Sequence, residues 1–320
     1  MTRKQKILLA GIASLSVGLL ALGCQVGMDH YQENPFSFEV QDTLPEGNGK
    51  VARVILLGGQ SNASGCSLDS YLAQNVSEEK YAEYSNGYDN VYIHYLAGDH
   101  RSQGFVKCAT LQGELEGAFG PELGLAERLS QLYPEETFFI IKCAWGGTNL
   151  YSQWLSPSSL GKTGTLYQQF VAFVQASMDY LRDKNYNVQI AGMCWMQGES
   201  DAFPEVAAEA YGAHLHNFIK DVRKQFAPYV AEEGMVFVDA YIAETPDLWV
   251  YYEAVNRGKQ KVAQESSLNV LVDTLEAGLT CSQEPVDNPD LAHYDSMSQI
   301  KLGHLFAEQL AAVWANMEDC

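Results

Sequence analysis

From residue 51 onward, short apolar runs alternate with longer segments whose apolar residues recur at helical spacing. The short runs are rich in β-branched and aromatic residues, and several are apolar at consecutive positions, as is typical of strands buried on both faces. They predict strands over residues 51–57, 91–96, 137–144, 188–195 and 235–242, with a further candidate at 269–273.

The segments between these runs predict helices. Leu125, Leu129 and Leu132 fall on one stripe of a helix, and Ser296 and Gln299 have the spacing of a capping box. The predicted helices span residues 121–132, 166–181 and 204–226, and a last one begins at 296. Alternating strands and helices indicate a parallel sheet covered on both faces, so we expect one three-layer α/β domain over residues 51–320.

The first residues predict an export signal rather than part of the fold. Arg3, Lys4 and Lys6 precede an uncharged apolar run over residues 7–23, which is short for a tilted membrane span. We therefore expect a signal peptide at residues 1–23.

The apolar run ends in a sequence that resembles a bacterial lipobox, in which a cysteine after the cleavage point takes a diacylglycerol. The residues are Leu20-Ala21-Leu22-Gly23-Cys24. We expect a lipid anchor on Cys24 and a flexible tether over residues 24–50, in a bacterial cell-envelope lipoprotein whose domain lies outside the cytoplasm. An uncleaved anchor and ordinary cleavage are the alternatives.

Composition limits the kinds of ligand and partner that the chain can bind. The chain has a formal net charge of -20, which argues against nucleic acid, because a nucleic-acid binder needs a basic face. No cysteine pair has C-x-x-C spacing and none has zinc-ligand spacing with a histidine. Cys143 and Cys194 lie inside apolar runs, so we expect them to be buried. Export would permit disulfides among the other cysteines, but the sequence does not give the pairing.

Four polar clusters follow predicted strands or precede the last helix, where ligands bind in parallel sheets. Glycines before Ser61 would allow a sharp turn toward a helix start, and Asp290 could fold back to Nδ1 of His293 and leave Nε2 free as a base. The clusters are Gly58-Gly59-Gln60-Ser61-Asn62, Trp145-Gly146-Gly147-Thr148-Asn149, Trp195-Met196-Gln197-Gly198-Glu199-Ser200-Asp201 and Asp290-Leu291-Ala292-His293.

In this order the clusters resemble the SGNH-hydrolase superfamily, in particular its sialate O-acetylesterase and acetyl-xylan-esterase branch. The matching motifs are G-Q-S-N at residues 59–62, G-G-T at 146–148, W-x-Q-G-E-x-D at 195–201 and D-x-x-H at 290–293. The resemblance implies a three-layer sandwich with a flavodoxin-like parallel sheet. It also implies a serine hydrolase that removes O-acetyl groups from carbohydrates, with no metal and no cofactor.

The resemblance also implies residue roles. Ser61 would attack the acetyl carbonyl, His293 would take its proton and Asp290 would orient His293. The N–H groups of Ser61 and Gly147 and the side-chain amide of Gln197 would hold the oxyanion. Possible supporting residues are Gln60, Asn62, Glu199 and Asp201.

The sequence leaves several alternatives open. Glu199 is the main rival of Asp290, and Ser200 lies in a sequence that approximates the nucleophile elbow of α/β-hydrolases. An SGNH lipase or esterase for other acyl esters and a non-catalytic carbohydrate-binding lipoprotein are the alternative functions. Aromatic residues beside the clusters could stack on sugar rings or pack in the core; they are Trp145, Tyr151, Trp154 and Trp195.

Overall fold

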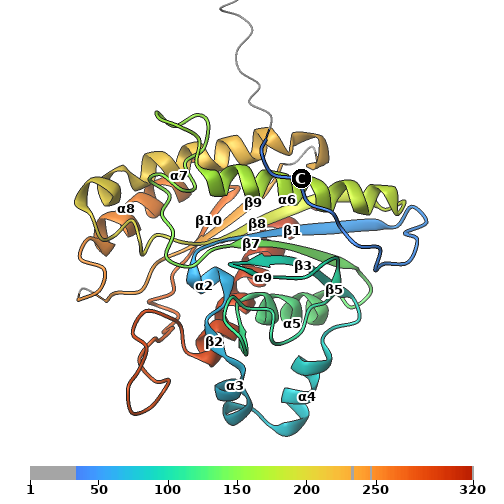
Figure 1. Ribbon diagram of the computed structural model, residues 1–320, viewed down its shortest axis with the longest axis horizontal. Coiled ribbons are helices and arrows are strands. Elements are labelled where there is room, and N and C mark those ends of the chain that lie inside the picture. The colour runs from blue at the N-terminus through green and yellow to red at the C-terminus, as the bar shows by residue number, and fades with distance from the viewer. Residues whose placement is uncertain (1–33, 232–233, 246, 319–320) are drawn as a thin grey trace, which may run out of the picture. The chain divides into compact units, whose positions relative to one another are not determined.

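A mostly parallel sheet forms the centre of the computed structural model, which describes residues 34–231, 234–245 and 247–318 (Figure 1). In sheet order, its parallel strands are β10 (Asn269–Val272), β9 (Val236–Ala240), β8 (Asn187–Met196), β1 (Val51–Gly59), β7 (Phe138–Ala144) and β3 (Val91–Ala97). Short antiparallel strands β4 (His100–Arg101) and β5 (Val106–Lys107) pair with β3, and β2 (Ser67–Leu68) pairs with β6 (Ala118–Phe119).

The predicted fold class is confirmed, and the long strands lie where the apolar runs predict them. The order differs from that of a flavodoxin sheet because the first and third parallel strands exchange places: β1 lies between β7 and β8, and β7 separates β1 from β3. From β1 the chain first builds one side of the sheet, through β3 and β7, and then returns to build the other side from β8. The loops after β1, β7 and β8 therefore meet where the winding direction reverses, which is where such sheets bind ligands.

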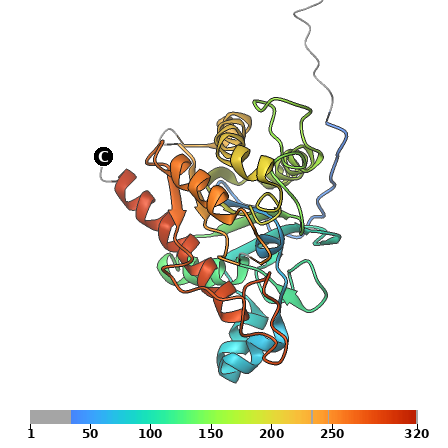
Figure 2. The ribbon, with the colours of Figure 1, turned by 90° about the vertical axis from the view of Figure 1, so that its left-hand side faces the viewer.

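Helices cover both faces of the sheet (Figures 1 and 2). One layer holds α6 (Thr165–Asp183), α7 (Glu205–Gln225) and α8 (Tyr252–Ala263), with the 3-10 helix η1 (Ala227–Tyr229) after α7; the other holds α5 (Glu122–Leu132) and α9 (Ser296–Glu318). The sequence predicts α5, α6, α7 and α9, but it predicts neither α8 nor η1. It also does not predict the short α2 (Ser61–Ser64), α3 (Asp69–Asn75) and α4 (Glu78–Asn86).

Neighbouring helices in both layers touch at glycines. A Cβ atom added to Gly303 of α9 would lie 2.2 Å from the carbonyl oxygen of Pro121, just before α5. In the other layer, a Cβ atom added to Gly212 of α7 would lie 3.0 Å from Cα of Gly258 in α8. Because backbone meets backbone at these points, α9 is held at a fixed distance from α5.

The segment before β1 packs onto the domain, which corrects the prediction of a flexible tether up to residue 50. Leu44 is buried, and the hydroxyl of Tyr180 in α6 accepts hydrogen bonds from the N–H groups of Thr43 at 3.0 Å and Leu44 at 2.9 Å. The compact unit accordingly begins at Phe36 rather than at residue 51. The partners on α6 are far away in sequence, so a local apolar pattern does not reveal them.

The predicted signal peptide and Cys24 lie outside the described residues. Within the part that is described, no helix combines the length and apolarity needed to span a membrane. Cys143 and Cys194 are buried, as predicted. The thiols of the described cysteines are free; these are Cys66, Cys108, Cys143, Cys194 and Cys281.

Glu127 in α5 forms polar contacts with both α4 and α9. Its buried carboxylate accepts a hydrogen bond from the hydroxyl of Tyr84 at 2.7 Å, lies 2.7 Å from Nε2 of His304 and forms an ion pair with Lys80. Burial alone would raise the pKa of Glu127, but the bonds to His304, Lys80 and Tyr84 outweigh it and lower this pKa to about 2.

This lowered pKa predicts acid-sensitive stability. A carboxyl group with a depressed pKa stabilises the folded state above its unfolded pKa and loses that contribution as the pH falls toward 2, here by roughly 3 kcal/mol at most. We expect the free energy of unfolding to fall less steeply below about pH 4.5 in Glu127→Gln than in the wild type, as measured by urea denaturation across pH. The exposed Glu135→Gln is the control, and equal slopes for wild type and Glu127→Gln would contradict the prediction.

Candidate active site

Ser61 lies at the turn that follows β1. The turn depends on Gly59, whose φ is 138°, and a Cβ atom there would lie 1.9 Å from the carbonyl oxygen of Met196 in β8. Only glycine fits this close approach. The turn lifts Ser61 out of the sheet to the first position of α2, where helix geometry leaves backbone N–H groups free to bind an anion.

His293 lies in the loop between β10 and α9 and is held by Asp290. Nδ1 of His293 is 2.6 Å from Oδ2 of Asp290, while Oδ1 of Asp290 accepts from the N–H group of Ala292 at 3.0 Å. Burial opposes ionisation of Asp290, but these bonds prevail and lower its pKa. A carboxylate on Nδ1 fixes the tautomer that leaves Nε2 as a proton acceptor.

Asn62 joins the Ser61 turn to the His293 loop. Its Oδ1 accepts a hydrogen bond from the N–H group of Tyr294 at 3.0 Å, and its Nδ2 donates to the carbonyl oxygen of Ala292 at 3.2 Å. These two groups belong to the peptide units on either side of His293. The residue next to Ser61 therefore clamps the segment that carries His293.

Glu199 supports the other side of Asn62 and does not bind His293. Its Oε1 accepts from Nδ2 of Asn62 at 2.8 Å, and its buried Oε2 has no hydrogen-bond partner among the described residues. Burial raises the pKa of Glu199, while the bond from Asn62 and the nearby Lys259 and His293 act in the opposite direction. Of the two rival acids, the geometry places Asp290 on the imidazole.

Gln197 does not take the position predicted for it. The residue is fully buried, and its Nε2 lies 2.6 Å from Oδ2 of Asp201, 3.1 Å from the carbonyl oxygen of Thr148 and 3.2 Å from Oε1 of Gln60. The side-chain amide of Gln197 has only two N–H groups to donate, and these three acceptors already occupy them. Donation from Gln197 to an oxyanion does not fit this arrangement, in which its amide instead connects the loops after β1, β7 and β8.

Asp201 fixes the loop after β7, which contains Gly147. Its two carboxylate oxygens accept from the N–H groups of Leu150 at 2.8 Å and Tyr151 at 2.9 Å. Burial raises the pKa of Asp201 to about 6, although these bonds and Gln197 oppose it. Gly147 is exposed with a φ of 67°, and apart from its two chain neighbours no described residue has an atom within 4 Å of the place where its Cβ would be, so its backbone is open to a ligand.

Gln60 holds the loop that carries Ser200. Its Oε1 accepts from the N–H groups of Gly198 at 3.3 Å and Ser200 at 3.2 Å, in addition to Nε2 of Gln197. In the described part of the chain, neither Ser61 nor Ser200 forms a hydrogen bond with a histidine. The arrangement favours Ser61 as the nucleophile because its neighbour Asn62 hydrogen-bonds the peptide units on either side of His293.

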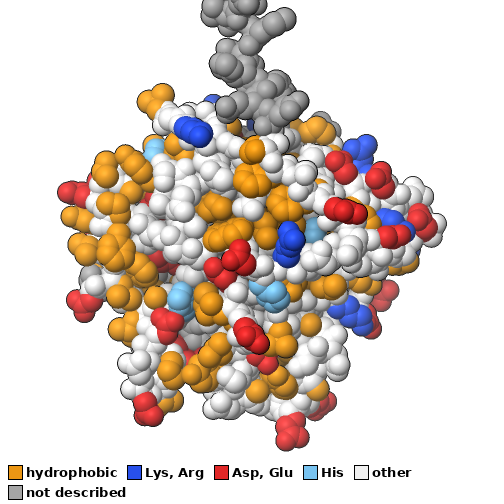
Figure 3. All heavy atoms as spheres, viewed as in Figure 1, with side chains coloured by type: hydrophobic (Ala, Val, Ile, Leu, Met, Phe, Trp, Pro, Cys, Tyr) orange, Lys and Arg blue, Asp and Glu red, His pale blue; other side chains and the backbone are white. Residues whose placement is uncertain are grey.

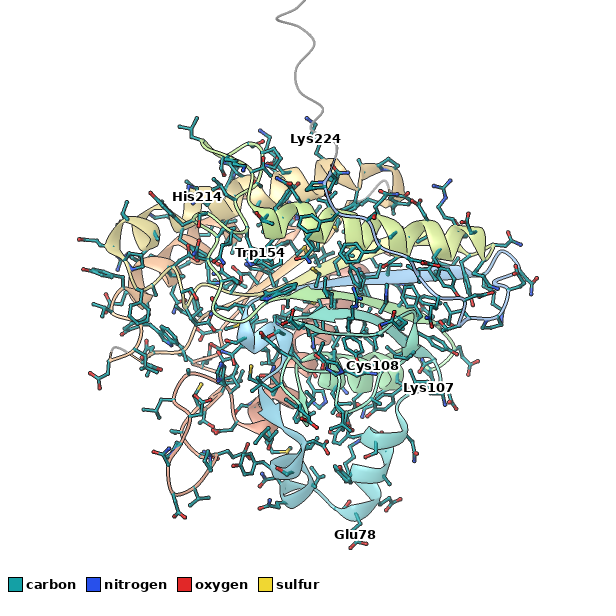
Figure 4. The ribbon with its side chains drawn as sticks, in the orientation of Figure 1. Glu78, Lys107, Cys108, Trp154, His214 and Lys224 are labelled. Carbon is teal, nitrogen blue, oxygen red and sulfur yellow. The ribbon has the colours of Figure 1, made fainter. Side chains whose placement is uncertain are left out.

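Two of the aromatic residues near the site belong to the core. Trp154 and Trp195 are fully buried, with ring centroids 5.3 Å apart, and Trp154 lies between the sheet and a helix layer (Figure 4). Tyr151 keeps 40% of its surface exposed. No group of three or more metal-ligating side chains is arranged around an ion site within the described ranges.

Comparison with known proteins gave one family. The family model described as carbohydrate esterase, sialic acid-specific acetylesterase, matches residues 51–312. A search of curated proteins found no match.

Several solved structures share the fold. A protein from Arabidopsis thaliana matches with 21% identity and a TM-score of 0.57, over 81% of this chain and 98% of its own. NanS matches with 16% identity and a TM-score of 0.61, over 86% of this chain and 100% of its own. A carbohydrate acetylesterase from Xanthomonas citri matches with 16% identity and a TM-score of 0.56, over 80% of this chain and 55% of its own.

The clamp formed by Asn62 leads to a test. In Asn62→Ala, the His293 loop loses both bonds, and we expect kcat for an acetyl ester to fall about 100-fold while KM changes little, because a displacement of about 1 Å costs that much. Acetate release measures the rate. The control is Asn187→Ala, at the start of β8, the end of that strand away from the Gln197 loop. An unchanged kcat in a folded Asn62→Ala protein would show that the clamp does not position His293.

Proposed function

The chain belongs to the carbohydrate esterase family of sialic acid-specific acetylesterases, and we propose that Ser61, His293 and Asp290 carry out its ester hydrolysis. The observation that carries the proposal is the clamp of Asn62 on both peptide units beside His293. It keeps the turn of the nucleophile and the loop of the base adjacent, although they are far apart in sequence.

The proposed reaction has two acyl-transfer steps. Oγ of Ser61 attacks the acetyl carbonyl carbon while Nε2 of His293 takes the hydroxyl proton; the bond to the sugar oxygen then breaks, and His293 gives that oxygen the proton. The sugar leaves as an alcohol, and the acetyl group stays on Ser61. Water then attacks the acetyl carbonyl carbon while Nε2 of His293 takes a proton from the water. The bond between that carbon and Oγ of Ser61 breaks, His293 gives Oγ the proton, and acetate leaves. Asp290 stabilises the imidazolium that forms in each step.

The N–H groups of Ser61 and Gly147 are the proposed oxyanion donors. The open backbone at Gly147 and the start of α2 at Ser61 support this assignment. One donor of this kind contributes on the order of 10²- to 10³-fold in rate. Gln197 is assigned to holding the Gly147 loop in place through Thr148 and Asp201.

Replacement of each candidate serine tests the nucleophile. We expect Ser61→Ala to lower acetate release from an acetylated carbohydrate on the order of 10⁴- to 10⁶-fold, because the acetyl-enzyme cannot form. The matched variant Ser200→Ala should keep most of the activity. Abolished release in Ser200→Ala with normal release in Ser61→Ala would reverse the assignment.

The enzyme is further proposed to be an exported bacterial lipoprotein anchored to a membrane by Cys24. The basic residues, the apolar run over 7–23 and the Leu20–Cys24 sequence support this proposal. When the full chain is made in a bacterium fed with radiolabelled palmitate, we expect the wild type to carry the label and Cys24→Ser to carry none. Cys66→Ser is the control, and equal labelling of wild type and Cys24→Ser would contradict the anchor.

A further inference from the structure

One carboxylate lies between the two segments that are proposed to hold the oxyanion. Oε2 of Glu114 accepts a hydrogen bond from the N–H group of Gly146 at 2.9 Å and another from the hydroxyl of Ser64. Gly146 immediately precedes Gly147 in the loop after β7. Ser64 is the last residue of α2, which begins at Ser61. A single oxygen atom of Glu114 therefore bridges the turn after β1 and the loop after β7.

Two glycines leave the space that this carboxylate occupies. A Cβ atom added to Gly146 would lie 2.7 Å from Oε2 of Glu114, and one added to Gly98 would lie 2.7 Å from its Cγ. Gly98 has a φ of 56°, and its N–H group donates to the carbonyl oxygen of Ala144, at the end of β7, at 3.0 Å. The chain after β3 and the chain after β7 therefore both lack a side chain that would displace Glu114.

The backbone around Glu114 is anchored on two sides. The N–H group of Glu114 donates to the carbonyl oxygen of Gly65, directly after α2, at 2.8 Å. Nζ of Lys142 in β7 donates to the carbonyl oxygen of Gln112 at 3.0 Å. Lys142 is fully buried and also pairs with Glu122 at 2.7 Å. The carboxylate thus extends from a fixed segment and can set the distance between the two segments that it bridges.

Negative charge alone does not distinguish Glu114 from other acidic residues. Several acidic side chains lie near the middle of the face in Figure 3. Glu116, on the same segment, is exposed and forms no hydrogen bond or ion pair with another described residue. Glu114 is half-buried, and its second oxygen, Oε1, accepts no hydrogen bond from a described residue. The two bonds to Oε2 are therefore the feature that calls for a function.

We propose that Glu114 is a positioning residue that holds the N–H groups of Ser61 and Gly147 at the separation that the oxyanion requires. This inference rests on the proposed function. Because the oxyanion forms only in the transition state, loss of the bridge lowers kcat and leaves KM for the ester nearly unchanged. A displacement of about 1 Å costs up to about 100-fold in rate.

Substitutions that keep or remove the acceptor test this role. Glu114→Met has a similar length but only a weak acceptor, and we expect kcat for an acetyl ester to fall about 10- to 100-fold with KM within about 2-fold. Glu114→Gln keeps a carbonyl oxygen for both donors and should retain at least about a third of the wild-type kcat. Methylboronic acid, which forms a tetrahedral adduct with a nucleophilic serine, should bind Glu114→Met more weakly by the factor by which kcat falls. Glu116→Met is the matched control and should keep the wild-type kcat.

Ser64→Ala removes one arm of the bridge and leaves Glu114 in place. We expect kcat to fall about 3- to 10-fold, with no further loss when Ser64→Ala is added to Glu114→Met, because both changes break the same bridge. A wild-type kcat in folded Glu114→Met or in Ser64→Ala, an equal loss in Glu114→Gln, or effects that multiply in the double variant would overturn the inference. The proposed function survives those results if Ser61→Ala has lost acetate release. A wild type that hydrolyses no acetyl ester would overturn the proposed function itself.

Discussion

The hydrogen bonds of Asn62 to the two peptide units around His293 are the constraint on which the candidate active site depends. They join segments separated by about 230 residues. The segment that carries Ser61 begins at the end of β1. The turn there requires Gly59, because no other residue fits the close approach to Met196. The other ends at α9, which Gly303 holds against the start of α5. Both sides of the clamp therefore start from rigid parts of the fold.

Beneath the clamp lies a buried polar network that connects the loops after β1, β7 and β8. Gln60, Gln197 and Asp201 form its centre. Close by, Lys259 of α8 pairs with Asp239 of β9 at 2.6 Å, and both side chains are buried. Burial raises the pKa values of Asp201 and Asp239, and the charge of Lys259 opposes this for both carboxyl groups. A network of this kind favours one arrangement of the loops, because a displaced member would leave polar atoms buried without partners.

The sequence predicts most of the fold, because the strands are continuous apolar runs and four of the long helices have clear apolar stripes. Helix α8 is not predicted since its buried positions include Asn256, Gly258 and Lys259, which do not form an apolar stripe. The position of Gln197 could not be predicted, because the direction of its amide is set by Asp201 and by a carbonyl group on another loop. The catalytic roles suggested by the motifs remain predictions, although the structure brings Asp290 and His293 together.

The glycine contacts between helices also bear on how this fold can vary. Where backbone lies against backbone, there is no side chain whose size could be changed to move the two helices of one layer apart. The helices around the sheet therefore can shift very little, and adaptation to differently shaped glycans must come from the loops at the carboxyl edge of the sheet. These loops can change in length and charge during evolution while the residues that would carry out the chemistry keep their positions.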